Sequence, residues 1–208
     1  MTKYLSVHPL NPQPRLLQQA AQILREGGIA AIPTDSCYAL ACHLDDKPAV
    51  DHLRRLRGID ERHHLSLLCR DLSEIATYAR VDNASYRLLR LATPGAYTFI
   101  LEATREVPRR LSHPSRKTIG IRVPDHPVAL QLLGELGQPL IGSSLQLPGD
   151  ELPLNDVEEI RERLNNELDL VIDAGSCGVQ PTTVIDLSGG VAKVLRVGRG
   201  PLEPLGLA

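Results

Sequence analysis

The sequence predicts an α/β protein in which helices pack on a mixed β-sheet, with a single domain over residues 1–208. Segments with the helical spacing of apolar residues alternate with short apolar runs, an order typical of sheets covered by helices. Residues 182–187 and 191–197 differ, because they read as a β-hairpin around the turn Ser188-Gly189-Gly190. A hairpin inside an alternating order implies that parallel and antiparallel strands share the sheet.

The helices expected in the first half of the chain each have a start or stop signal. Gly27 and Gly58 follow the first two helices, at the position where glycine commonly ends a helix. Asp71 and Glu74 have the spacing of a capping box and open the third helix. The fourth helix stops before Pro94. In order, these helices span residues 14–26, 48–57, 71–79 and 83–92.

Short apolar runs bounded by turn residues indicate buried strands. Two further helices lie between them in the second half, at 127–136 and 155–168. The expected strands before the hairpin span residues 28–33, 38–44, 65–69, 97–103, 118–123, 139–143 and 170–173.

The composition bounds the class of protein. The formal net charge is −2, so any anion site must be a local patch. The N-terminal residues contain no continuous apolar segment, and no stretch reaches the roughly 18 apolar residues of a membrane helix. We therefore expect a cytoplasmic protein without a membrane partner. The cysteines form no CxxC pair and are expected to stay reduced.

Standard catalytic and cofactor motifs are absent from the sequence. It lacks the phosphate loop GxxxxGK(S/T), the dinucleotide motif GxGxxG, the zinc motif HExxH and the GxSxG nucleophile elbow. His63 and His64 are adjacent, so they cannot easily face one metal ion from a helix, and an exposed polar loop is the simpler interpretation. We therefore expect no metal site.

Arginine clusters and strand-end hydroxyls remain as polar features. Arginine suits bidentate phosphate contacts, although a solvated surface is an equally good interpretation of either cluster alone. Hydroxyls at strand ends can hold carboxylate or phosphate oxygens, but each one alone is more commonly a turn residue. Together they suggest a polar anion pocket. The clusters are Arg54, Arg55, Arg57 and Arg62, then Arg105, Arg109, Arg110, Arg116 and Lys117; the hydroxyls are Thr34, Ser143, Ser144, Thr182 and Thr183.

Five segments resemble motifs of the YrdC/YciO family in the same order and spacing. They resemble its PT(D/E) strand end, its RxPxHP segment, its STSAN loop, its PSTVVD strand and its RxG. The resemblance covers residues 14–200 and is closest to the YciO branch. The segments are 31–36, 118–127, 139–144, 180–186 and 195–198.

The resemblance implies a twisted open mixed sheet, flanked by helices, around a central positively charged cavity. Family members make threonylcarbamoyl-adenylate from threonine, bicarbonate and ATP, release pyrophosphate, and so feed threonylcarbamoyladenosine modification of tRNA. Members also bind double-stranded RNA or tRNA. ATP is then a substrate, accompanied by Mg²⁺, and no tightly bound cofactor is expected.

Site residues follow from the resemblance position by position. It leaves the catalytic residues unknown, and it implies a pocket that works mainly by positioning and charge stabilisation at the α-phosphate, without a covalent intermediate. The residues implied for threonine are Thr34, Arg122, Gly142 and Thr182. Those implied for the nucleotide are Arg55, Arg57, Thr118, Ser143, Ser144 and Arg196.

Two departures from the family pattern leave the function open. The synthases carry a Lys-x-Arg pair for the triphosphate. An ungapped match places that pair on Arg57 and Ile59, whereas a match shifted by two places it on Arg55 and Arg57. Gln146 replaces the Asn of the STSAN loop. Three hypotheses follow: a threonylcarbamoyl-AMP synthase-like enzyme, a double-stranded RNA- or tRNA-binding protein with a degenerate nucleotide pocket, and a related carbamoyl- or nucleotide-processing enzyme.

Overall fold

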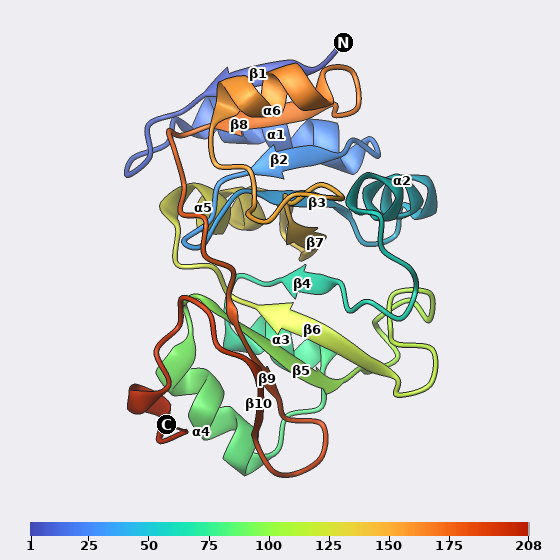
Figure 1. Cartoon of the computed structure of the whole chain (residues 1–208), viewed down its shortest axis with the longest axis vertical. Coiled ribbons are helices and arrows are strands. Elements are labelled where there is room, and N and C mark those ends of the chain that lie inside the picture. The colour runs from blue at the N-terminus through green and yellow to red at the C-terminus, as the bar shows by residue number, and fades with distance from the viewer. Residues whose placement is uncertain (208) are drawn as a thin grey trace.

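The computed structural model describes residues 1–207. Within them, one open sheet of ten strands runs through the molecule and six α-helices flank it (Figure 1). The strands are β1 (Lys3–Ser6), β2 (Ala30–Ile32), β3 (Ala39–His43), β4 (Ser66–Leu68), β5 (Tyr97–Glu102), β6 (Thr118–Arg122), β7 (Leu140–Ser144), β8 (Leu170–Asp173), β9 (Thr183–Asp186) and β10 (Lys193–Arg196). The helices are α1 (Pro14–Arg25), α2 (Lys47–Arg57), α3 (Leu72–Tyr78), α4 (Asn83–Ala92), α5 (Pro127–Leu136) and α6 (Val157–Leu164), and a 3₁₀ turn follows at Glu203–Leu205.

The sheet is mixed, as the hairpin predicted. Its strands lie in the order β1-β8-β2-β3-β7-β4-β6-β5-β9-β10. β4 pairs with β6 in parallel and β5 pairs with β9 in parallel, while β9 and β10 form the predicted antiparallel hairpin. The strand β1 is an addition to the expected elements, and it joins the edge of the sheet in parallel with β8. Helix α6 is shorter than expected, because it begins after the capping carboxylate of Asp156 and ends at Leu164.

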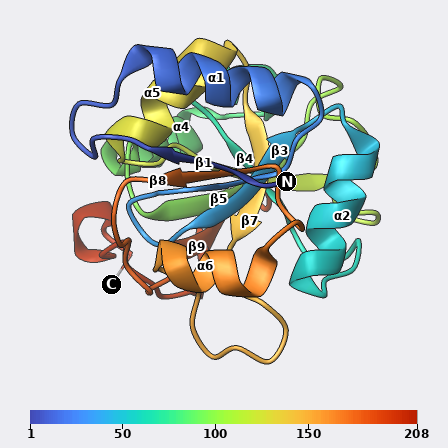
Figure 2. The ribbon, with the colours of Figure 1, turned by 90° about the horizontal axis from the view of Figure 1, so that it is seen from above.

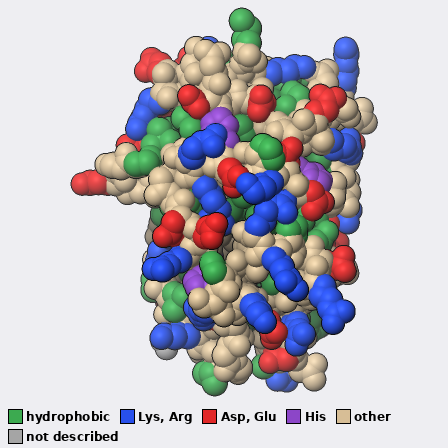
Figure 3. All heavy atoms as spheres, turned by 90° about the vertical axis from the view of Figure 1, so that its right-hand side faces the viewer, with side chains coloured by type: hydrophobic (Ala, Val, Ile, Leu, Met, Phe, Trp, Pro, Cys, Tyr) green, Lys and Arg blue, Asp and Glu red, His purple; other side chains and the backbone are tan. Residues whose placement is uncertain are grey.

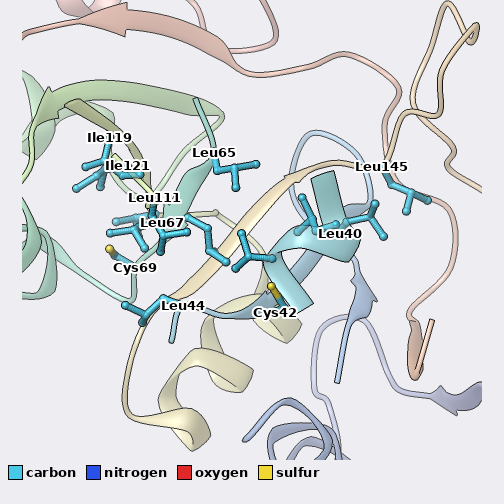
Figure 4. Close-up of a cluster of buried hydrophobic side chains, with 14 of the residues drawn as sticks. Leu40, Cys42, Leu44, Leu65, Leu67, Cys69, Leu111, Ile119, Ile121 and Leu145 are labelled. Atoms are coloured by element: carbon cyan, nitrogen blue, oxygen red, sulfur yellow. The ribbon is translucent and has the colours of Figure 1, made fainter. Parts of the chain in front are cut away.

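Two apolar clusters cover the two faces of the sheet. On one face, α1 and α5 lie side by side (Figure 2), and the cluster there includes Leu24 and Leu133 of these helices together with Ala39 and Leu140 of β3 and β7. The larger cluster, part of which Figure 4 shows, lies on the other face and receives apolar side chains from α2, α3, α4 and α6.

The face that carries α1 and α5 also carries a row of polar side chains farther along the sheet. Successive side chains of a strand point to opposite faces. In β6, Ile119 and Ile121 enter the larger cluster, so Thr118, Gly120 and Arg122 lie on the opposite face. β4 and β5 flank β6, and β9 pairs with β5; by this register Ser66, Thr98 and Asp186 lie on the same face as Gly120 and Arg122.

None of the helices within residues 1–207 has the length and apolar character needed to cross a bilayer.

Candidate functional site

A cavity of about 320 Å³ lies over this polar stretch of the sheet. Strands β3 to β7, β9 and β10 contribute to its wall, together with the end of α2 and the loop after it. No Asp or Glu is among its lining residues in the described part of the chain. The positively charged cavity remains a prediction, since acidic groups outside the lining pair with some of its cations. The polar lining residues include Arg57, Arg62, Arg122 and Arg196 with Ser66, Thr98, Ser143, Ser144 and Thr182.

Arg122 is the most buried cation of the cavity, with 5% of its surface exposed. Its Nη2 forms an ion pair with Asp35 and donates to the Thr34 hydroxyl at 3.2 Å. The Thr34 hydroxyl in turn donates to the Cys37 carbonyl at 2.5 Å, which fixes its orientation. Nε of Arg122 is buried without a hydrogen-bond partner in the described residues. A guanidinium held on one side in this way can offer its remaining group to a carboxylate.

A second group of cations and hydroxyls lines the same cavity. Nε of Arg57 donates to the Ser143 hydroxyl at 3.1 Å. Arg196 donates to the Thr182 carbonyl oxygen through Nε at 3.1 Å and Nη2 at 2.9 Å. The Thr182 hydroxyl lies 2.8 Å from the Thr98 hydroxyl. Fixed hydroxyls beside guanidinium groups suit phosphate oxygens.

The cations of the cavity act on two nearby histidines, His63 and His126. Burial, Arg57, Arg54 and Arg196 lower the pKa of His63, so these cations surround that ring. Burial lowers the pKa of His126 as well, and Arg122 is the cation that acts on it.

His64 is a partly buried cavity residue rather than part of an exposed loop. Its Nε2 lies 2.8 Å from the Thr118 hydroxyl, and its ring stacks on His113 with centroids 5.1 Å apart. Burial, followed by the charges of His113 and Arg116, lowers the pKa of His64 to about 4. The imidazole is therefore neutral at physiological pH.

Gly142 and Gln146 shape the wall formed by β7 and the loop after it. A Cβ on Gly142 would lie 2.9 Å from the Leu40 carbonyl oxygen of the paired strand, so only glycine fits there. Nε2 of Gln146 donates to the Asp150 carbonyl oxygen at 2.9 Å. The amide of Gln146 is thus turned toward its own loop.

The structure brings most residues of the sequence-based site together. Thr34 and Thr118 are absent from the lining and lie behind it, as partners of Arg122 and His64. Sequence reasoning did not select His64 or Thr98, since a lone histidine or threonine gives no signal before the fold is known. Those predicted residues that line the cavity are Arg57, Arg122, Gly142, Ser143, Ser144, Thr182 and Arg196.

Arg55 does not join the predicted nucleotide residues. Residues of a helix are rotated by about 100° each, so Arg55 and Arg57 point to nearly opposite sides of α2. Arg55 is exposed and lines a separate hollow with His52 and Arg163. The geometry therefore does not support the match shifted by two, which assigns Arg55 to the nucleotide. It agrees with the ungapped match, in which Arg57 is the first residue of the pair and Ile59 the second.

Known proteins are similar to this chain in sequence and in fold. A family model named Sua5_yciO_yrdC and described as "Telomere recombination" matches residues 22–198. YciO of Escherichia coli K12 is 50% identical over 204 residues, which cover 98% of this chain and 99% of the relative. The crystal structure of E. coli YciO has a TM-score of 0.95 and likewise covers 98% of this chain and 99% of its own.

Relatives whose names state an activity or a ligand are less similar in sequence. Threonylcarbamoyl-AMP synthase of Halorhodospira halophila is 31% identical over 180 residues, covering 86% of this chain and 93% of the enzyme. The structure of P. abyssi Sua5 complexed with L-threonine is 25% identical with a TM-score of 0.90, and covers 98% of this chain and 60% of Sua5. With its fold and its sequence matched along nearly their whole length, the chain belongs to the Sua5/YciO/YrdC family.

Proposed function

We propose that this chain is a threonylcarbamoyl-AMP synthase-like enzyme that acts on threonine, bicarbonate and ATP. The observation that carries the proposal is the presence of two distinct cation and hydroxyl groups in one cavity. Arg122 with Thr34 suits a carboxylate, whereas Arg57 with Ser143 suits phosphate oxygens. The 31% identity to a threonylcarbamoyl-AMP synthase supports the same reaction. Its product, threonylcarbamoyl-adenylate, would feed modification of tRNA.

The proposed chemistry needs positioning more than a reactive side chain. The amino nitrogen of threonine bonds to the carbon of bicarbonate, with loss of water, to give a carbamate. A carbamate oxygen then bonds to the α-phosphorus of ATP, the bond from that phosphorus to the bridging oxygen breaks, and pyrophosphate leaves. Cations fixed around the phosphates stabilise the developing charge. ATP enters as its magnesium complex, and Mg²⁺ is thus part of the substrate.

The test is pyrophosphate release in the presence of ATP, threonine and bicarbonate, with the adenylate identified by mass spectrometry. We expect turnover that disappears when threonine is omitted. Arg122→Gln should abolish threonine-dependent turnover while ATP binding is retained, which also shows that the variant is folded. Arg109→Gln removes an exposed charge and serves as the control. Release of pyrophosphate at the same rate with and without threonine would contradict the proposal.

A second function, binding of double-stranded RNA or tRNA, is proposed for the basic segment before β6. Arg110 and Arg116 are partly engaged, with the Leu44 carbonyl oxygen and with Asp186. Arg105, Arg109 and Lys117 are exposed and have no ion pair within residues 1–207. Figure 3 shows Lys and Arg side chains spread over one face of the molecule, several of them in its lower half, with Asp and Glu side chains among them.

RNA binding through exposed cations should weaken steeply with salt. Converting Arg109 to Glu should lower affinity for a tRNA transcript several-fold, and Arg122→Gln should change it little. The reverse ranking would place RNA in the cavity instead.

A further inference from the structure

The segment Gly58–His64 links the end of α2 to the strand β4. Gly58 adopts a left-handed conformation with φ of 62° and ends the helix. The next residue, Ile59, turns its side chain onto the larger apolar cluster. Ile59 is where the ungapped family match places the second cation for the triphosphate. At this position the chain has therefore exchanged a cation in the cavity for an apolar contact with the core.

Asp60 then builds a tight turn whose orientation is fixed by the protein. Its Oδ1 accepts hydrogen bonds from the backbone N–H of Arg62 at 2.9 Å and of His63 at 3.3 Å. Its carbonyl oxygen accepts from Nη1 of the buried Arg54 at 2.5 Å. Because the turn is held from both sides, Arg62 and His63 are presented to the cavity, and both line it.

The surroundings of this turn favour a highly charged anion. Arg57 and Arg196 lie near enough to act on the His63 ring, and Arg54 acts on it from the helix side. Two acidic side chains lie in the turn itself: the Asp60 carboxylate accepts from backbone N–H groups and also acts on the His63 ring, and Glu61 acts on Arg54. Arg57, Arg62 and Arg196 line the cavity together with the His63 imidazole. Such a set of groups suits a chain of phosphates better than a single phosphate.

We propose that the Asp60–His63 turn is the polyphosphate-binding element of this chain, in which Arg62 supplies the second cation that Ile59 does not. The inference rests on the proposed function and deepens it, because it assigns the β- and γ-phosphate end of the nucleotide to a loop three residues beyond the family position. The ligand class is a nucleoside triphosphate or an inorganic polyphosphate, rather than a monophosphate.

Arg55 offers a matched control for Arg62. Both are exposed arginines within the same stretch of chain, but Arg55 lies outside the cavity. Calorimetric titrations with tripolyphosphate, ATP and AMP at fixed ionic strength should separate them. Arg62→Ala should weaken tripolyphosphate and ATP by about tenfold, the effect of one lost charge-assisted contact, and leave AMP within about twofold. Arg55→Ala should leave all three ligands within about twofold.

Each contrary result has a distinct meaning. If Arg62→Ala binds tripolyphosphate as the unmodified chain does, or if Arg55→Ala loses as much affinity, the assignment of the turn is wrong while a nucleotide site elsewhere in the cavity stands. If the unmodified chain binds ATP no more tightly than AMP, the polyphosphate element is likewise overturned. If it binds neither ATP nor AMP, both the inference and the proposed synthase function fail.

Discussion

Replacing Asp35 with Asn should lower the stability of the fold and raise its affinity for carboxylate ligands. The side chains of Asp35 and Arg122 are 12% and 6% exposed, so their ion pair is largely removed from water. Two unit charges about 4 Å apart attract by about 4 kcal/mol at an effective dielectric constant of roughly 20. Removing one partner of a buried pair typically costs about 3–5 kcal/mol. Arg122 keeps its hydrogen bond to Thr34 and borders the cavity, so we expect a loss of about 2 kcal/mol.

The same change should favour a bound carboxylate. In the free protein, Asp35 occupies Nη2 of Arg122, and its negative charge repels a ligand carboxylate that approaches the same guanidinium. An uncharged Asn removes this repulsion and leaves Arg122 in need of an anion. We expect threonine to bind about tenfold more tightly, a gain of about 1.4 kcal/mol. Asp35 would then stabilise the empty site at the expense of affinity.

Urea unfolding measures the first effect and calorimetric titration with threonine measures the second. Asp125→Asn is the matched control, because Asp125 is exposed and the variant has the same change in net charge. It should alter the free energy of unfolding by less than about 0.5 kcal/mol. An Asp35→Asn variant that is as stable as the unmodified chain, or that binds threonine more weakly, would refute the competition between Asp35 and the ligand.

Two further predictions concern the walls of the cavity. Gly198→Ala should cost about 1–3 kcal/mol of unfolding free energy and weaken ligand binding, because its Cβ would lie 2.2 Å from the Pro181 carbonyl oxygen. Gly189→Ala in the adjoining hairpin, where the Cβ meets nothing within 4 Å, should leave the urea midpoint nearly unchanged, and equal effects would contradict the steric explanation. The pKa of His64 is lowered from 6.5 to about 4, so between these values the unfolded chain binds a proton that the folded chain excludes, and stability falls as the pH falls. As the pH is lowered through this range, the free energy of unfolding of His64→Gln, measured with urea, should therefore fall by about 1–2 kcal/mol less than that of the unmodified chain. This figure allows for the partial exposure of His64. If both proteins lose stability equally, His64 is not the source of the pH dependence.

Local patterns predicted the elements of the fold because helices and strands bury one face, so that apolar residues recur in the sequence with the period of the element. The glycines after α1 and α2 and the hairpin turn were readable for this reason. The strand β1 was not, since Lys3-Tyr4-Leu5-Ser6 buries only Leu5 and has too few apolar residues to signal a strand. Its place is decided by pairing with β8, more than 160 residues away. Such long-range pairing leaves no local signal.

In the site as well, the sequence predicted which residue types are present, but only the fold shows which of them face the cavity. Sequence alone could not choose between the two alignments of the arginines in α2, because Arg54, Arg55 and Arg57 are all cations near one helix end. The rotation of the helix decides it: Arg57 reaches Ser143 in the cavity, and Arg55 faces another hollow. Arg62 belonged to the same cluster in the sequence, but only the Asp60 turn shows which way it points.

The strand β6 contains a signal that links the fold to the site. Its residues alternate between polar or small and apolar, the pattern expected when one face of a sheet meets solvent. Yet all five residues of β6 are buried, including Thr118 and Arg122. A polar face that is not exposed to bulk water must face hydrogen-bonding partners, and here these are Thr34, Asp35 and His64. The alternation in β6 therefore reflects the polar cavity that lies over this part of the sheet, to whose lining the helices α1 and α5 contribute no residue.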